Sequence, residues 1–397
     1  MVGNRLRVGL IGGILAASGV LVSPATAWAQ AAASDSGSLL DSAAVRARLV
    51  SARLESPAAT QRARPGRPEA GLTQYLEGVG QLTKHEFDSA LVNLRAAVTV
   101  GPNTARYHGD LAYAYAGLQR WDEAGTEYAT AIRLQGANPW YYVGLGAVRA
   151  AQGRWAEAGA NFALAKATDS TILDPKVIGA ASFVFERDGN EQQLFEWSQA
   201  GTRLFPNDPG PWLRVATLLR SRGDTGQGLV AIRRFHTLQP DDHLGQAVFA
   251  LYLYDIGQND SAVAFAHAAA ADSAMHQYAS MVFLRVGARM LQAKQYDRAA
   301  QVLDEGRGIT PAGLNRMRYT HYLGLANLMR IPTIYNDATQ KKDCAEGRMA
   351  DSLLTSVDQD IRATAQLDSA QAAQILTTYV PQLRQRIDAF KTTCRGQ

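Results

Sequence analysis

The sequence is poor in the residue patterns that catalytic and metal sites require. His85-Glu86 begins a string like that of zinc proteases, but Ser89 stands where the second histidine is needed. No nucleophile elbow and no phosphate-binding glycine loop occurs. The seven histidines have no cysteine or carboxylate partner at metal-ligand spacing: His85, His108, His236, His243, His267, His276 and His321. We therefore expect no catalytic residue, no metal, no cofactor and no enzymatic activity.

Charged residues are also scarce, at 19 % of the chain, and their formal net charge is only +4. Removal of a signal peptide that carries Arg5 and Arg7 lowers this charge to +2, because the same segment contains no acidic residue. Proteins that bind phosphate backbones carry clusters of lysine and arginine. The balance of charge therefore argues against nucleic acid as a partner.

The N-terminus has the three-part pattern of a secretory signal peptide. Two arginines precede an apolar run over residues 8–22, and Ala27-Trp28-Ala29 forms a small-residue cleavage site. We expect residues 1–29 to be removed and the protein to be periplasmic or secreted, with no integral membrane segment left. An uncleaved N-terminal anchor is the alternative, although the apolar run is shorter than a full membrane span.

Only two cysteines occur, Cys344 and Cys394, and export would place both in an oxidising compartment. Residues 345–365 and 369–391 are predicted to form two helices joined by a short turn. An antiparallel pair of similar length returns the chain to its start, so the two cysteines are expected to meet in a disulfide. Their spacing is not that of a redox-active CxxC pair.

Residues 30–70 are rich in alanine, serine, proline and arginine and have few large apolar residues. Residues 43–54 are compatible with one short helix, and residues 57–68 are typical of a flexible linker. The arm is basic because it contains Arg46, Arg48, Arg53, Arg62, Arg64 and Arg67. We expect a solvated tether; contact with an anionic surface is the alternative.

The most informative feature is a set of three segments that align at a spacing of 34 residues. Phe87, Trp121 and Trp155 each stand three residues before an alanine. The aligned alanines and large apolar residues that follow are Ala90, Ala124 and Ala158, then Leu94, Tyr128 and Phe162, then Ala97, Ala131 and Ala165. A fixed period in this range indicates a helical-repeat solenoid.

At these residues the chain resembles the tetratricopeptide repeat family, which has small residues at repeat positions 8, 20 and 27 and often proline at position 32. The match is strong over residues 71–104, 105–138 and 139–172. It is weaker over 175–208, where Leu194, Ser182 and Gly201 occupy the small positions, and over 209–242, 243–276 and 280–313. The resemblance implies an all-α, right-handed α-solenoid of about seven helix pairs over residues 71–330. One further helix is expected at 319–329, and residues 331–397 are expected to form a C-terminal helical-hairpin cap, with Pro381 kinking its last helix.

In this family the first helix of each repeat lines a concave groove. Transferred to this sequence, the groove positions are Tyr75, Val79, Arg106, Tyr113, Trp140, Val143, Lys176, Phe183, Glu186, Leu213, Arg220, Leu251 and Tyr254. Tyr113, Trp140 and Phe183 are the expected main contacts. A register error of one residue would make some of these positions core residues instead. Asp110 stands where carboxylate-binding members of the family have asparagine, which argues against a carboxylate clamp.

We therefore expect a scaffold or adaptor of the cell envelope that binds a segment of another envelope protein in its groove. An alternative is a polymer-binding or enzyme-associated subunit whose aromatic side chains stack on glycan or peptidoglycan. Self-association through an exposed groove or cap is also open. Nothing in the sequence identifies the partner.

Overall fold

The computed structural model describes residues 69–394, which divide into two compact units between Arg222 and Gly223. The predicted signal peptide and almost all of the basic arm lie outside the described residues. The division falls inside the predicted solenoid and between two helices that are consecutive in sequence. Each unit is described by itself below.

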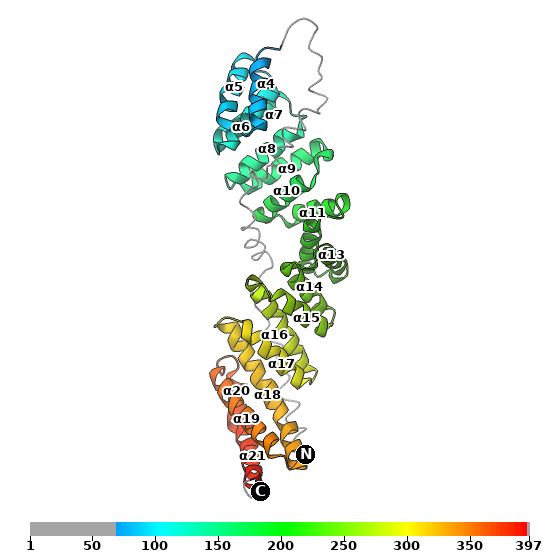
Figure 1. Cartoon of the computed structure of the whole chain (residues 1–397), viewed down its shortest axis with the longest axis vertical. Coiled ribbons are helices and arrows are strands. Elements are labelled where there is room, and N and C mark those ends of the chain that lie inside the picture. Colours follow the sequence, from blue (N-terminus) through cyan, green and yellow to red (C-terminus); the bar gives the residue numbers. More distant parts are fainter. Residues whose placement is uncertain (1–68, 395–397) are drawn as a thin grey trace. The chain divides into compact units, whose positions relative to one another are not determined.

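The first unit, residues 69–222, consists of helices stacked in pairs (Figure 1). Its elements are α4 (Leu72–Thr83), α5 (Phe87–Val100), α6 (Ala105–Gly117), α7 (Trp121–Leu134), α8 (Pro139–Ala151), α9 (Trp155–Thr168), the 3-10 helix η4 (Ser170–Ile172), α10 (Pro175–Asp188), α11 (Glu191–Leu204) and α12 (Pro209–Ser221).

The second unit, residues 223–394, continues with helix pairs and ends in longer helices. Its elements are α13 (Thr225–Leu238), α14 (His243–Asp255), α15 (Asn259–Ala269), the 3-10 helix η5 (Ser273–Met275), α16 (His276–Gln292), α17 (Tyr296–Ile309), α18 (Leu314–Lys341), α19 (Cys344–Ala363), α20 (Ser369–Gln374), the π-helical turn η6 (Ile375–Tyr379) and α21 (Val380–Cys394). Counted along the chain, α4 to α17 make the seven expected pairs.

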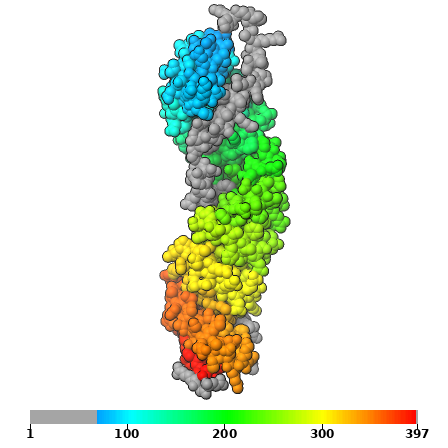
Figure 2. Space-filling view, in the orientation of Figure 1, coloured from blue at the N-terminus to red at the C-terminus, as the bar shows by residue number. Residues whose placement is uncertain are grey.

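These observations confirm the predicted all-α repeat fold for the described residues, among which every regular element is a helix. In the space-filling view the colours follow the sequence within each unit, because each pair lies next to the pairs that precede and follow it (Figure 2). A fold of this kind buries its apolar faces only between neighbouring pairs. No helix in residues 69–394 is both long and apolar enough to cross a membrane.

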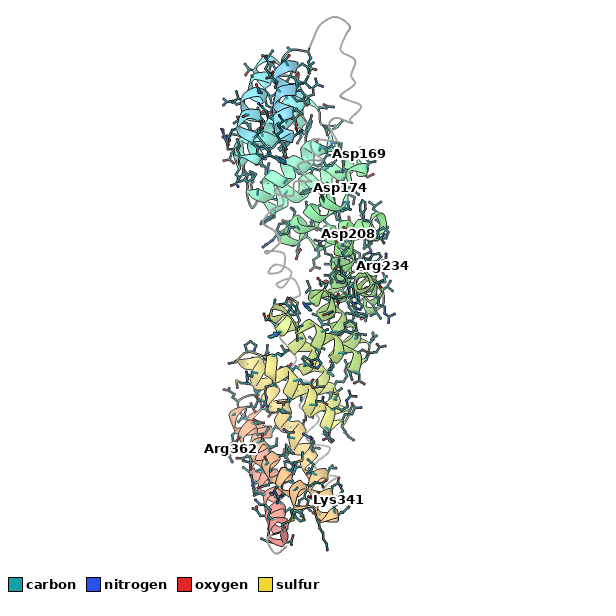
Figure 3. The ribbon with its side chains drawn as sticks, viewed as in Figure 1. Asp169, Asp174, Asp208, Arg234, Lys341 and Arg362 are labelled. Carbon is teal, nitrogen blue, oxygen red and sulfur yellow. A yellow bond between two sulfur atoms is a disulfide. The ribbon has the colours of Figure 1, made fainter. Side chains whose placement is uncertain are left out.

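Several helices begin where an acidic or amide side chain accepts hydrogen bonds from the first free backbone N–H groups. Asp174 Oδ1 accepts from the backbone N of Lys176 and of Val177, at 2.7 and 2.9 Å. Asp208 caps α12 in the same way, and both aspartates are labelled in Figure 3. Asp242 caps α14 by accepting a hydrogen bond from Gly245 N at 2.6 Å.

Within the helix pairs, the turn between the two helices carries one residue with a left-handed backbone. In successive pairs this residue is His85, Gln119, Gly153, Gly189, Gly223, Gly257 and Lys294, with φ between 57° and 81°. Side chains other than glycine are strained in this region by roughly 1–2 kcal/mol. Three of the seven turns therefore carry strain that glycine would remove.

Gln119→Gly is accordingly expected to stabilise the first unit by about 0.5–1 kcal/mol, the relieved strain being partly offset by a more flexible unfolded chain. Chemical denaturation followed by tryptophan fluorescence measures this change. The matched control is Gly153→Ala, which adds a side chain at φ 72° and should destabilise by about 1 kcal/mol. A destabilising Gln119→Gly would show that the turn residue does not limit stability.

The two helices of a pair pack closely because small residues face large ones. A Cβ atom added to Gly78 would lie 2.7 Å from Cγ of Leu94, and one added to Gly287 would lie 2.5 Å from Cγ of Leu303. These contacts join repeat positions 8 and 24 in the first and seventh pairs. The resemblance predicted small residues at position 8, and the structure supplies the reason.

A second recurring contact joins the first helix of a pair to the loop before it. The side chain at repeat position 4 donates to the carbonyl of the proline that ended the previous pair: His108 Nε2 to Pro102 O at 2.8 Å, Trp212 Nε1 to Pro206 O at 3.0 Å, and Gln246 Nε2 to Pro240 O at 2.9 Å. Each bond satisfies a carbonyl that the preceding helix leaves unbonded. The shared need for a donor to this carbonyl explains why histidine, tryptophan and glutamine occupy the same repeat position.

His108 adds a charged bond to this contact, since its Nδ1 lies 2.6 Å from Glu127 Oε2. The bond to Glu127 raises the pKa of His108, against the opposing effect of burial. The folded state therefore binds the proton more tightly than the unfolded state does. The resulting stability is fully present below about pH 6.5, the unfolded pKa, and is lost as the pH rises through the folded pKa.

His108→Gln is expected to keep the bond to Pro102, as Gln246 does in its own repeat, and to lose the charged bond. The stability gap between the wild-type protein and the variant should be roughly 1–2 kcal/mol near pH 5.5 and should shrink near pH 8.5. Denaturation curves at the two pH values test this. An equal gap at both would mean that His108 stays neutral.

The last helices differ in detail from the sequence prediction. The helix expected at 319–329 is α18, which spans Leu314–Lys341 and continues through Pro332. The distortion expected at Pro381 takes the form of the π-helical turn η6, in which Val380 N bonds to Ile375 O. A proline ring inside a helix clashes with a carbonyl of the preceding turn, and an i→i+5 turn just before the proline relieves this clash.

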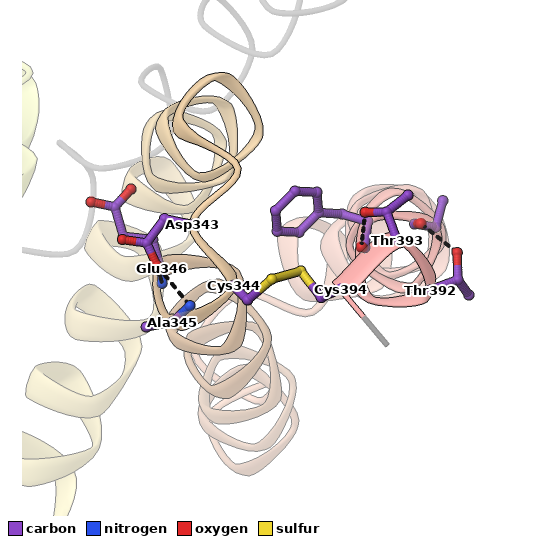
Figure 4. Close-up of a disulfide and its surroundings, with 9 residues drawn as sticks. Asp343, Cys344, Ala345, Glu346, Thr392, Thr393 and Cys394 are labelled. Carbon is purple, nitrogen blue, oxygen red and sulfur yellow. Dashed lines mark hydrogen bonds between the residues drawn. A yellow bond between two sulfur atoms is a disulfide. The ribbon is translucent and has the colours of Figure 1, made fainter. Parts of the chain in front are cut away.

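The expected hairpin after α18 is present, and it brings the two cysteines together. Cys344 begins α19 and Cys394 ends α21, with Cα atoms 5.8 Å apart and their sulfur atoms joined (Figure 4). Asp351 on α19 also accepts hydrogen bonds from Arg384 and Lys391 on α21, each at 2.7 Å. The disulfide and this ion cluster link the same two helices.

Candidate functional site

The candidate site is the surface formed by the first helices of the pairs, which we call the inner face. In the first unit α4 adjoins α6, α6 adjoins α8 and α8 adjoins α10, whereas the second helices of neighbouring pairs approach one another less. Stacked pairs curve toward the side on which they approach most closely. The first helices therefore occupy the side that the family resemblance assigns to the groove.

The structure divides the predicted groove residues into two groups. Those inside the protein are Tyr75, Tyr113, Val143, Leu213 and Leu251, each at most 9 % exposed. Those that reach the surface are Val79, Arg106, Trp140, Phe183, Glu186, Arg220 and Tyr254, which are half-buried, and Lys176, which is exposed. The second group contains the candidate contact residues.

Near α4 and α6 the polar side chains are bonded to one another. Tyr75 Oη donates to Asp110 Oδ2 at 2.8 Å. The guanidinium of Arg106 pairs with Glu69 and lies 5.2 Å from the ring centroid of Tyr75. Asp110 thus places a bonded carboxylate where a carboxylate clamp would need a neutral donor.

The part of the inner face around α8 contains one large ring at the surface. Trp140 lies in the first turn of α8, whose N-cap residue Asn138 accepts from the backbone N of Trp140 at 3.1 Å. Its ring packs against the hydrophobic clusters on both sides of α8. Its indole N–H has no acceptor among the described residues and is not among the buried unbonded groups. The ring is therefore held in place while its donor faces solvent.

Near α10 and α12 the inner face carries a half-buried carboxylate, Glu186. Burial raises its pKa, and the charges of Arg214 and Arg187 act in the opposite direction. No residue between 69 and 394 donates a hydrogen bond to this carboxylate. Arg187 lies 5.2 Å from the ring centroid of Phe183, one turn earlier on α10. Glu186 itself follows Phe183 by three residues on α10, a spacing that gives the two side chains neighbouring positions on the helix.

In the second unit the predicted contact Tyr254 is covered by arginine. The guanidinium of Arg289 lies 3.6 Å from its ring centroid and donates to Tyr254 O at 2.6 Å and to Asn259 Oδ1 at 3.1 Å. Arg285 lies near the same ring, at 5.9 Å. Tyr254 therefore presents a cationic surface rather than a bare ring.

Sequence reasoning did not assign a site role to Phe87, Trp121 and Trp155, although their spacing defined the repeat. They begin α5, α7 and α9, and all three are half-buried. Phe87 meets Tyr113 edge to face at 6.0 Å, and Trp155 meets Phe183 at 5.9 Å. The 34-residue period could have identified these three residues, because residues at the same repeat position lie along one edge of a stack of helix pairs.

Groups suited to metal chemistry are absent from residues 69–394: no cluster of three or more histidine, cysteine, aspartate or glutamate side chains occurs there. Several histidines instead contact neighbouring helices. His267 Nε2 lies 3.0 Å from Glu305 Oε2, and His236 packs against Phe249 and Phe265. His321 is buried between Thr364 and Gln371.

No protein-family model and no curated protein matches this sequence. Among solved structures it is similar to YrrB, described as a TPR protein with an unusual peptide-binding site, at 15 % identity over 47 % of this chain and 95 % of that chain, with a TM-score of 0.43.

Two further structures are similar at the same level. PilF of Pseudomonas aeruginosa has 21 % identity over 50 % of this chain and 89 % of that chain, with a TM-score of 0.40. A tetratricopeptide repeat protein of Parabacteroides merdae has 14 % identity over 65 % of this chain and 99 % of that chain, also at 0.40.

Because these TM-scores are below 0.5, the fold assignment rests on the helices of this chain. Helix pairs recur at the predicted spacing, and the turn between the two helices of each pair has one residue with a left-handed backbone. Small residues meet large ones at repeat positions 8 and 24. By its own helix pairs, this chain is a tetratricopeptide-type α-solenoid.

Proposed function

We propose that this protein is a non-enzymatic scaffold that binds a segment of another protein on the inner face of its first unit. The observation that carries the proposal is the half-buried carboxylate of Glu186 beside the ring of Phe183. A carboxylate that has lost water and accepts no hydrogen bond gains most from a donor that a partner brings. A segment with a basic or amide side chain next to an apolar anchor fits this pair of groups.

The proposed setting is the cell envelope, where the protein would assemble or stabilise a complex after export. This part rests on the signal-peptide pattern of residues 1–29. Trp140 would supply a second anchor, since large rings held by their surroundings make the strongest contacts at interfaces.

The test is a cross-linked pull-down from the native envelope, with the tagged protein compared with its Glu186→Gln and Phe183→Ala variants. Glu186→Gln keeps the shape of the side chain and removes its charge, so affinity for the captured partner should fall about tenfold or more. The matched control is Glu191→Gln, which removes an exposed carboxylate from α11 in the same repeat.

Glu186→Gln also removes the carboxylate charge that attracts the buried guanidinium of Arg214, so the circular dichroism and denaturation curve of the variant are compared with those of the wild-type protein before capture is compared. A partner captured equally by wild-type protein, both variants and the control would contradict an inner-face site. Capture of the chain itself, dependent on Glu186, would identify self-association.

A second candidate function is binding of a cell-wall polymer, favoured by the exposed part of the Trp140 ring. Aromatic rings stack on sugars as well as on peptide side chains. Co-sedimentation with purified cell-wall polymer, lost in Trp140→Ala and retained in Glu186→Gln, would support this function over the first.

A further inference from the structure

In the second unit, the helices on the inner side carry arginine and almost no acidic residue. α14 adjoins α16, and α16 adjoins α18, so these three helices share one side of the unit. α16 and residues 314–336 of α18 contain five arginines and neither aspartate nor glutamate, and α14 has one acidic residue, Asp255, at its last position. The five arginines are Arg285, Arg289, Arg316, Arg318 and Arg330.

The acidic residues of the intervening helices are paired with other bases. All four acidic side chains of α15 and α17 lie within ion-pair distance of a basic side chain. The pairs are Asp260 with Arg298, Asp297 with Arg330, Asp304 with Arg307, and Glu305 with His267. These pairs use only one arginine of α16 and α18, Arg330. The inner side of the unit is therefore more positive than the side formed by α15 and α17.

Helix periodicity places two of the arginines on the side of α16 that faces away from α17. Gly287 faces α17, because a Cβ atom added to it would lie 2.5 Å from Cγ of Leu303. Arg285 and Arg289 stand two residues before and after Gly287, which is about 200° around the helix. Their contacts agree with this placement, since both guanidinium groups lie near the ring of Tyr254 on α14, at 5.9 and 3.6 Å from its centroid.

Arg318 and Tyr322 occupy the corresponding side of α18. Gly324 faces α19, because a Cβ atom added to it would lie 3.2 Å from Cδ1 of Ile361. Tyr322 stands two residues before Gly324, and Arg318 stands one turn before Tyr322; both are half-buried. Burial raises the pKa of Tyr322 and the charge of Arg318 acts in the opposite direction, so the two groups lie close together.

We call Tyr254, Arg285, Arg289, Arg318 and Tyr322 the basic face. It offers donors for which the protein supplies few acceptors. Arg289 donates to two uncharged oxygens, Tyr254 O and Asn259 Oδ1, and no carboxylate of residues 69–394 pairs with Arg289 or Arg318. Within the same residues the hydroxyls of Tyr254 and Tyr322 have no hydrogen-bond partner, and neither is a buried unbonded group, so both reach solvent. Carboxylates brought by a ligand would gain charge-assisted hydrogen bonds here.

We infer that the basic face binds an acidic segment of a partner protein. Its carboxylates accept hydrogen bonds from Arg289, Arg318 and the tyrosine hydroxyls, and its apolar atoms pack against the two rings. Arginine and tyrosine are enriched among the residues that dominate protein–protein interfaces, which favours a protein segment over a phosphate polymer. The inference goes beyond the proposed function, because the two surfaces belong to different units and take segments of opposite charge.

The test is a calorimetric titration of the purified full chain with octaglutamate whose two ends are blocked, at low ionic strength. Saturable binding is expected, and octaglutamine of the same length should not bind. Arg318→Gln removes one charge and breaks no hydrogen bond or ion pair of residues 69–394, and it should weaken binding about tenfold or more. Arg289→Gln should act in the same direction. The matched control is Arg298→Gln, which removes an exposed arginine from α17 and should leave the affinity nearly unchanged.

Three outcomes would overturn the inference: no binding of octaglutamate, equal binding by Arg318→Gln and the wild-type protein, or tighter binding of polyphosphate of equal charge through Arg318. The last outcome would assign the basic face to a phosphate polymer. The proposed function fails separately, because octaglutamate binding should not depend on Glu186. If octaglutamate does not bind while envelope capture still depends on Glu186, only the basic face is lost. If octaglutamate binds through Arg318 while capture is independent of Glu186, the site in the first unit is lost instead.

Discussion

Replacing Cys344 and Cys394 together by alanine is expected to lower the stability of the second unit by about 4 kcal/mol. The two cysteines are 50 residues apart in sequence, and closing a loop of that length restricts the unfolded chain. The loss should be confined to the second unit, since each repeat contacts only its neighbours.

The distribution of tryptophan allows the two units to be followed separately. All tryptophans of residues 69–394 lie in the first unit, at 121, 140, 155, 197 and 212. Tryptophan fluorescence therefore reports the first unit, whereas far-ultraviolet circular dichroism reports helices in both. The double variant should shift the dichroism transition and leave the fluorescence transition in place.

A reducing agent provides the control for this prediction. Reduction of the wild-type protein should reproduce the shift and have no further effect on the variant. If the wild-type protein does not respond to reduction, the two cysteines are not bridged in solution, and the ion cluster around Asp351 holds the last helices alone.

Trp197→Ala is the substitution expected to cost most in the first unit, at about 3–5 kcal/mol. Trp197 is fully buried and meets Phe162 and Phe185 at ring distances of 6.4 and 5.9 Å. Removing its ring leaves a cavity at the centre of the fourth pair, where rigid helices on both sides prevent collapse. Chemical denaturation followed by the remaining tryptophans measures the loss.

Trp197→Phe separates packing from polarity in the same place. The indole N–H of Trp197 is buried without an acceptor, so its removal takes away an unfavourable group along with some volume. The expected cost is therefore much smaller than that of alanine. Equal losses for both variants would show that the indole itself, rather than ring volume, stabilises the fourth pair.

Two details of the fold show how far the repeat pattern extends. The fourth repeat was predicted as degenerate because Leu194, Ser182 and Gly201 occupy positions where alanine or glycine is usual. In the structure its core is organised around Trp197, one residue before a usual bulky position that holds Ser198. The repeat pattern located the fourth repeat but did not identify Trp197 as the residue that fills its core.

The groove residues show the same limit. Tyr113 and Trp140 were both predicted as main contacts from their repeat positions, yet Tyr113 is 3 % exposed and Trp140 is half-buried. Tyr113 lies under Phe87, which belongs to the preceding repeat. Whether a position is covered depends on the size of a side chain 26 residues away, which the period alone does not give.

The sequence by itself determined the helix pairs, their turns, the capping aspartates and the hairpin that brings Cys344 to Cys394. Each depends on residues close together in the chain or on a repeated spacing, because propensity and capping act locally. Only the tertiary structure decided which aromatic rings reach solvent and where a carboxylate such as Glu186 loses its hydrogen bonds. Those properties depend on contacts between neighbouring pairs, where packing, and not local preference, decides what is exposed.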